Sequence, residues 1–151
     1  MHTQPVWFEE LAARNWSQAV IEATARFPLV RSQVIAGLSS LDERVRSAAV
    51  ATLNEANDAS AHDLVASLAR DADEQVQHEV FEYLGEFPKQ ADIPLLLWNL
   101  RSRTFLFLSS SALQTLCGGV GPLIEDDDDP RHISESLAEW ERVLRNRGVD
   151  A

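Results

Sequence analysis

The 151-residue chain is poor in several features, and each shortage excludes a class of protein. A single cysteine, Cys117, excludes an internal disulfide, so we expect a reducing, cytoplasmic setting. No apolar run approaches the roughly 18–20 residues that a membrane-spanning helix needs, so we expect no membrane partner. The opening stretch MHTQPVWFEELAARNW lacks a basic region followed by an apolar one, so we expect no secretory signal.

Positive charge is also scarce, because 24 Asp and Glu residues face 13 Lys and Arg residues, which gives a net charge of −11. Only one of these cations, Lys89, is a lysine. Nucleic-acid binding relies on cations that neutralise phosphates, so the charge argues against a nucleic-acid partner and against an anionic membrane surface. It favours a basic protein partner, although acidity also simply keeps proteins soluble.

What the chain does contain is a repeat with a period of 31 to 32 residues. Three stretches align: VRSAAVATL from Val45, VQHEVFEYL from Val76 and LSSSALQTL from Leu108. Their first, fifth and ninth residues are apolar or small, and offsets of four and eight lie on one side of a helix. The predicted buried stripes are Val45, Ala49 and Leu53; Val76, Val80 and Leu84; and Leu108, Ala112 and Leu116.

A first helix of about twelve residues is predicted before each of these stretches. Its apolar positions are Leu64 and Leu68 in one repeat, and Leu96 and Leu100 in the next. Asp42 and Asp73 precede the second helices as candidate N-caps, because a short side-chain oxygen accepts a free backbone N–H there. A helical hairpin cannot bury its apolar stripe alone, so we expect neighbouring hairpins to stack around a continuous core.

These features resemble the HEAT repeats of the short type related to phycobilisome lyases. The resemblance lies in DERVRSAAVATL, DADEQVQHEVFEYLGEF and ADIPLLLWNL, with Pro94 at the proline of the family's first helix. It implies an all-α fold, a right-handed α-solenoid of about seven or eight helices, working as a monomer. It also implies that Arg46 pairs with Asp71 in an Asp–Arg ladder between repeats, which Gln77 and Ser109 interrupt in the next two repeats.

We predict a single domain, residues 1–151, with four parts. Cap helices occupy 1–28, three core repeats 29–118, an acidic loop 119–130 and a C-terminal cap helix 131–148. The cap helix carries an apolar stripe of Ile133, Leu137, Trp140, Val143 and Leu144. Cys117 is predicted to be a small core residue. Trp98 lies off the leucine stripe, which leaves it as a core residue or an exposed binding anchor.

The adjacent pair His78-Glu79 raises the question of a metal site. In HEAT repeats the second helix of each hairpin lines the concave face, and QHEVFEYLG is similar to the His-Glu stretches of deoxyhypusine hydroxylase. That enzyme uses four such pairs to hold two irons. The equivalent positions here are Ser47-Ala48 and Ser110-Ser111, so too few ligands converge and we predict no metal and no cofactor. Recognised catalytic motifs are missing too, so we predict no enzyme activity.

The sequence therefore predicts a non-enzymatic module that binds a basic protein partner on the concave face. The predicted contact residues are Ser47, His78, Glu79, Glu82, Ser110, Ser111 and Gln114, with Asp126, Asp127, Asp128 and Asp129 steering the partner. A scaffold or adaptor role fits, and so does an immunity protein or antitoxin that occupies the basic site of a toxin such as a nuclease. A phycobilin-lyase-like role also stays open. Three alternatives to this steering role stay open for the acidic run. It is a solvated loop, its negative charges interact favourably with the N-terminal end of the next helix, or it binds a cation.

Overall fold

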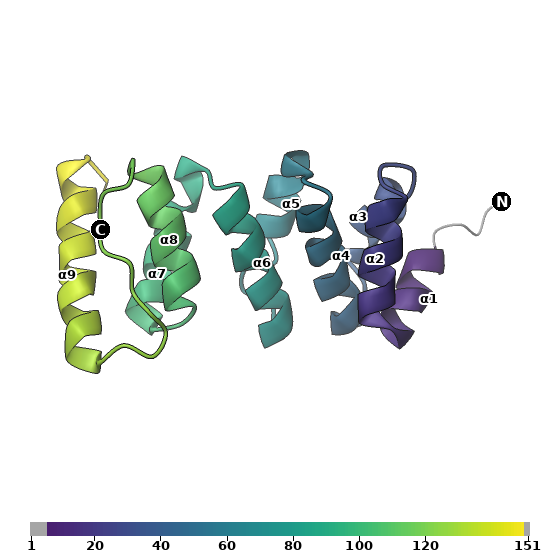
Figure 1. Ribbon diagram of the computed structural model, residues 1–151, viewed down its shortest axis with the longest axis horizontal. Coiled ribbons are helices and arrows are strands. Elements are labelled where there is room, and N and C mark those ends of the chain that lie inside the picture. Colours follow the sequence, from purple (N-terminus) through teal and green to yellow (C-terminus); the bar gives the residue numbers. More distant parts are fainter. Residues whose placement is uncertain (1–5, 150–151) are drawn as a thin grey trace. The chain divides into compact units, whose positions relative to one another are not determined.

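The computed structural model describes residues 6–149, which form nine α-helices and two short 3-10 helices and contain no strand (Figure 1). The predicted all-α class is confirmed. The helices are more numerous than predicted, because the N-terminal cap region holds both α1 (Val6–Arg14) and α2 (Trp16–Ala25). The chain divides into two compact units, Met1–Tyr83 and Leu84–Ala151, whose boundary falls inside α6 (Glu74–Glu86). The single domain thus stays a prediction.

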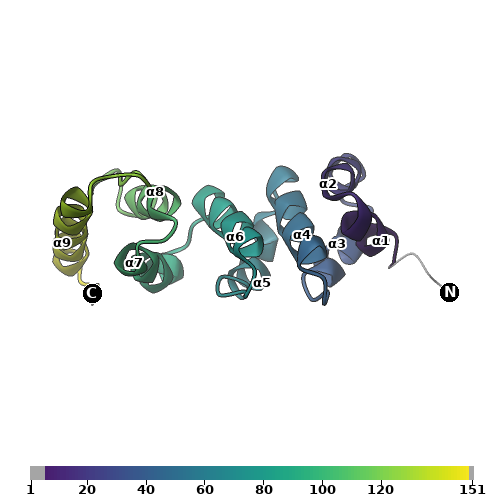
Figure 2. The ribbon, with the colours of Figure 1, turned by 90° about the horizontal axis from the view of Figure 1, so that it is seen from below.

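The first unit consists of two layers of helices. One layer contains α2, α4 (Glu43–Glu55) and the start of α6, and the other contains α1, α3 (Arg31–Gly37) and α5 (His62–Ala66) (Figure 2). Helix α2 packs against α1 and α4, and α3 packs against α1 and α4. The second helices of successive hairpins therefore share one layer.

Local sequence signals set the second helices of this unit. The Asp42 carboxylate accepts a hydrogen bond from the Arg44 backbone N–H at 2.9 Å, and Asp73 accepts one from Val76 N–H at 3.1 Å, so both predicted N-caps are confirmed. The stripes of α4 and α6, beginning at Val45 and Val76, are completely buried. Each valine or leucine of these stripes contributes roughly 1.5–3 kcal/mol on full burial.

The first helices are shorter than predicted. Helix α3 has seven residues, and α5 has only five and follows a 3-10 helix at Ala59–Ala61. In α5 the buried apolar residue is Val65, whereas Leu64 is 50% exposed. The 3-10 segment winds more tightly than an α-helix, so the spacing used to predict Leu64 as buried does not hold across it.

The second unit contains α7 (Ile93–Ser102), which follows a 3-10 helix at Gln90–Asp92 and packs against α8 (Leu106–Leu116). The buried side of α8 carries Leu106, Leu113 and Cys117, whereas Leu108 and Leu116 are only half-buried. Arg103 and Phe105, in the turn before α8, have positive φ angles, and this turn ends where α8 begins at Leu106. The predicted stripe of this repeat is therefore rotated, while the core position of Cys117 is confirmed.

A loop and a long helix, α9 (Pro130–Asn146), complete this unit. The predicted stripe of α9 is buried at Ile133, Trp140, Val143 and Leu144, and Leu137 is half-buried. The Trp140 indole N–H donates to the Pro122 carbonyl at 2.6 Å, which ties the loop to the helix. Gly121 stands directly over the ring with φ +109°, and a Cβ built there would lie 2.2 Å from it.

Candidate protein-binding groove

The His-Glu pair on α6 forms part of a small charged cluster. The His78 ring lies between two carboxylates, with Nδ1 3.8 Å from Glu79 and Nε2 3.7 Å from Glu82. The side chains of His78 and Glu82 are nearly half exposed, whereas that of Glu79 is only 14% exposed. Glu79 also accepts a hydrogen bond from the Gln75 side-chain amide at 2.7 Å. Glu79 is therefore a held, mostly buried carboxylate rather than a solvated one.

Burial also changes the acidity of Glu79. Loss of solvent raises its pKa above the ordinary value of 4.5, and the neighbouring Glu82 charge adds to this shift. The His78 ring and the Gln75 amide only partly oppose it. A cation brought beside Glu79 by a ligand would offset this burial and favour the charged form.

These carboxylates line a groove of about 620 Å³ on the face formed by α2, α4 and α6, within the first unit. We call it the acidic groove. Its apolar lining comes from α2 and α4 and consists of Trp16, Val20, Ile21, Ala25 and Ala51. Its polar lining consists of Thr24, Asn54, Glu55, Glu79 and Glu82. The apolar residues of α2 and the three carboxylates of α4 and α6 match a ligand that is both apolar and cationic.

Two side chains of α2 give this groove its apolar character. Ile21 is 64% exposed, and it lies beside Trp16, Val20 and Ala25 in the groove lining, so it belongs to a contiguous apolar surface rather than standing alone. The half-buried Trp16 donates its indole N–H to the Ser47 hydroxyl on α4 at 2.9 Å, which fixes the ring. The sequence predicts only cap helices for residues 1–28, which include Trp16, and does not reveal this role. The spacing of four residues between Trp16, Val20 and Thr24 is the signal that could have found this wall.

The predicted contact residues differ in burial. Ser47 and Ser110 are buried, at 1% and 0% exposure, so each side chain offers very little surface to a partner. Each hydroxyl has an internal role, because Ser47 accepts from Trp16 and Ser110 accepts from the Ile124 N–H at 2.9 Å.

The remaining predicted residues divide between the two units. His78, Glu79 and Glu82 lie in the first unit, with the last two in the acidic groove. Ser111 and Gln114 lie on α8 in the second unit and are half-buried. The Gln114 amide donates to the Gly121 carbonyl at 2.9 Å, so it helps to hold the loop.

The acidic run is largely occupied by backbone contacts. Asp126 accepts a hydrogen bond from the Leu106 N–H at the start of α8 at 2.8 Å. Asp128 accepts from the Glu125 N–H at 2.8 Å, and Asp129 caps α9 by accepting from the Arg131 N–H at 2.8 Å. Asp127 is exposed. Three of the four carboxylates thus satisfy backbone donors, as short polar side chains commonly do at turns and helix starts.

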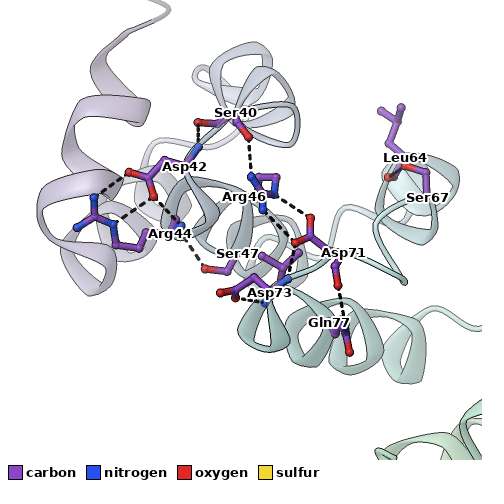
Figure 3. A network of polar contacts seen from close by, with 11 residues as sticks. Ser40, Asp42, Arg44, Arg46, Ser47, Leu64, Ser67, Asp71, Asp73 and Gln77 are labelled. Atoms are coloured by element: carbon purple, nitrogen blue, oxygen red, sulfur yellow. Dashed lines mark hydrogen bonds and ion pairs between the residues drawn. The ribbon is translucent and has the colours of Figure 1, made fainter. Parts of the chain in front are cut away.

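The side chains of Arg46 and Asp71, which the sequence predicts to pair, lie in direct contact (Figure 3). The Arg46 guanidinium donates from Nε to Asp71 Oδ2 at 2.8 Å and from Nη2 to Oδ1 at 3.0 Å, while Nη1 donates to the Ser40 carbonyl at 2.9 Å. The Gln77 amide occupies the next position and donates to the Asp71 carbonyl. This network joins α4 to the turn that precedes α6.

The described residues provide neither a metal site nor a membrane span. Among residues 6–149, no group of three or more His, Cys, Asp or Glu side chains is placed to hold a metal ion. Within the same described range, no helix has both the length and the apolar character that crossing a membrane requires.

Trp98 on α7 is 46% exposed. Of the two predicted alternatives, a core residue or an exposed binding anchor, the core position is therefore excluded.

Comparison with known proteins places the hairpins in a family. A family model of HEAT repeats matches residues 32–117, which is more than half of the chain. Neither the comparison with curated proteins nor the comparison with solved structures finds a match.

Proposed function

Because the chain belongs to the HEAT repeat family, whose members generally mediate protein–protein interaction, we propose that it binds a basic, amphipathic segment of a partner protein. The acidic groove holds this segment. The observation that carries the proposal is the pairing of an exposed apolar wall with three carboxylates in one groove. Apolar area supplies affinity, and the complementary charges supply specificity and a faster encounter.

The contributions of the two walls differ in size. Covering the exposed part of Ile21 contributes about 1–2 kcal/mol, by the usual value for burying an aliphatic side chain. A cation beside Glu82, which is 45% exposed, adds roughly 0.2–1 kcal/mol, because solvent screens such a pair. The apolar wall therefore dominates affinity, and the carboxylates select a basic segment over an acidic one.

Selection from a library of short random peptides displayed on phage tests this proposal. We expect the enriched peptides to combine Lys or Arg with large apolar residues. In about 0.15 M salt, where charges act over about 8 Å, Glu82→Arg should weaken their binding about threefold to tenfold, because it removes a weak attraction and adds a repulsion of similar size. Glu135→Arg makes the same change at an exposed position of α9, in the second unit, and it should have little effect.

Either of two results would overturn the proposal. One is the enrichment of peptides without cationic residues, because the carboxylate wall would then have no role in recognition. The other is an equal loss of binding in the Glu82 and Glu135 variants, because the effect would then come from overall charge rather than from the groove.

A further inference from the structure

A second groove, of about 460 Å³, adjoins the acidic groove in the same unit. We call it the polar groove, and it is lined by Trp16, Glu43, Arg44, Ser47, Asp73 and Gln75. Trp16 lines both grooves. On the opposite side, Gln75 of the polar groove donates its amide hydrogen to Glu79 of the acidic groove at 2.7 Å. Trp16 and the hydrogen-bonded pair Gln75 and Glu79 therefore lie where the two grooves meet, and we call these three residues, together with Ser47, the waist.

The waist is fixed before any ligand arrives. The indole N–H of Trp16 is held at 2.9 Å by the Ser47 hydroxyl, which in turn donates to the Arg44 carbonyl at 3.2 Å. Ser47 itself is buried, so its rotamer is set by packing. An aromatic ring that is already oriented loses little conformational entropy on binding, which is typical of binding anchors.

The charges around the polar groove also favour a cation. Glu43 and Asp73 are acidic, and the one cation there, Arg44, is engaged by Asp42 through two hydrogen bonds of 3.1 and 2.9 Å. A basic segment that lies in the acidic groove can therefore continue past Trp16 without meeting an unpaired positive charge. An acidic segment would meet carboxylates on both sides of the waist.

We propose that one partner segment runs through both grooves and places an arginine at the waist, with its guanidinium over Trp16 and paired with Glu79. The inference rests on the proposed function and names the residue that the groove recognises. Arginine suits the waist better than lysine does, because a planar guanidinium stacks on an indole and donates two parallel hydrogen bonds to one carboxylate. A lysine ammonium is a compact, strongly hydrated charge, so it can pair with the carboxylate but cannot stack as a plane on the indole or donate two parallel hydrogen bonds.

The peptides enriched in the selection above supply the probe. In each, single arginines are replaced by lysine or by citrulline, which keeps the shape and removes the charge, and Kd is measured by fluorescence anisotropy. We expect one position at which lysine weakens binding about threefold to tenfold and citrulline weakens it more. If lysine replaces every arginine without loss, the arginine assignment is overturned.

A second measurement locates the peptide on the protein. Each tryptophan gives one indole N–H signal in a ¹⁵N NMR spectrum, and we expect the Trp16 signal to shift on binding. The signals of Trp98 and Trp140, which lie in the second unit, serve as internal controls. Gln75→Ala should weaken binding about threefold or more and leave the unfolding midpoint nearly unchanged. Ser47→Ala should weaken binding by a similar factor and reduce the preference for arginine over lysine, and it should also lower the unfolding midpoint slightly, because the buried hydroxyl makes two hydrogen bonds.

The outcomes separate this inference from the proposed function. If the selected cationic peptides depend on Glu82 but bind the Gln75→Ala variant with unchanged affinity, the acidic groove alone binds them and the shared path is wrong. If no cationic peptide is selected, the proposed function fails and the inference fails with it.

Discussion

Replacing Asp71 with Asn tests the ion pair between α4 and the turn before α6. The side chains of Arg46 and Asp71 are only 18% and 8% exposed, so the variant leaves a largely buried guanidinium without its charged partner. Loss of one partner from a fully buried pair typically costs 3–5 kcal/mol. Partial exposure of Arg46 and its remaining bond to the Ser40 carbonyl reduce this value, and we expect a loss of about 2–3 kcal/mol in the free energy of unfolding.

The pH dependence gives this prediction a second test. Burial alone would raise the pKa of Asp71, but hydrogen bonds from Arg46 and the Asp73 backbone N–H outweigh it and lower the pKa below its ordinary value of 3.8. A carboxyl group with a lowered folded-state pKa stabilises the fold above the unfolded-state pKa, and this contribution is lost as pH falls through the folded-state pKa. The difference between wild type and Asp71→Asn should therefore be constant near neutral pH and shrink below about pH 4.

Urea unfolding followed by circular dichroism measures the effect. We expect a lower midpoint with an unchanged slope, and a fall in Tm of roughly 5–10 °C for a chain of this size. Asp127→Asn makes the same chemical change at an exposed aspartate and should shift stability by less than about 0.5 kcal/mol. Equal midpoints for the two variants would refute the reasoning, because the ion pair would then contribute nothing beyond a surface charge.

Two matched pairs of substitutions test the packing around single side chains by thermal unfolding. Gly121→Ala should destabilise by about 2–4 kcal/mol, because it combines a positive φ with a clash against Trp140. Gly85→Ala, on a helix with open space around it, should stabilise by about 0.5–1 kcal/mol; the same sign for both would contradict this. Thr24→Val should be neutral or stabilising, because the Thr24 hydroxyl oxygen is buried with no hydrogen-bond partner among the described residues. Thr52→Val should cost about 1 kcal/mol, because that hydroxyl donates to a carbonyl at 2.8 Å, and an equal response in the two variants would count against the assignment.

The sequence was informative wherever a structural feature depends on nearby residues. An N-cap needs only one side chain and the next few backbone N–H groups, so Asp42 and Asp73 could be identified from position alone. The long stripes beginning at Val45 and Val76 span several helical turns, which fixes the buried face without ambiguity. The family resemblance predicted the stacked-hairpin fold and the ion pair between Arg46 and Asp71.

What could not be predicted depends on contacts between distant residues. Leu64 and Val65 are adjacent apolar residues in a five-residue helix, which is too short for periodicity to decide which of them is buried. Ser47 looked like a polar surface residue, but its hydroxyl is buried against a tryptophan 31 residues away. The hydrogen bond to Ser47 also orients Trp16 in the groove. The spacing of Trp16 along α2 indicates which side of that helix it occupies, but it does not indicate which residue of another helix it contacts.

The acidic run has a consequence for how this chain can drift in evolution. Asp126, Asp128 and Asp129 act as acceptors for backbone N–H groups, and an asparagine, serine or threonine oxygen can do the same. We therefore expect related chains to exchange these small polar residues freely at the three positions, while the negative charge itself is lost and regained. Asp127, which is exposed and caps nothing, should vary without restriction.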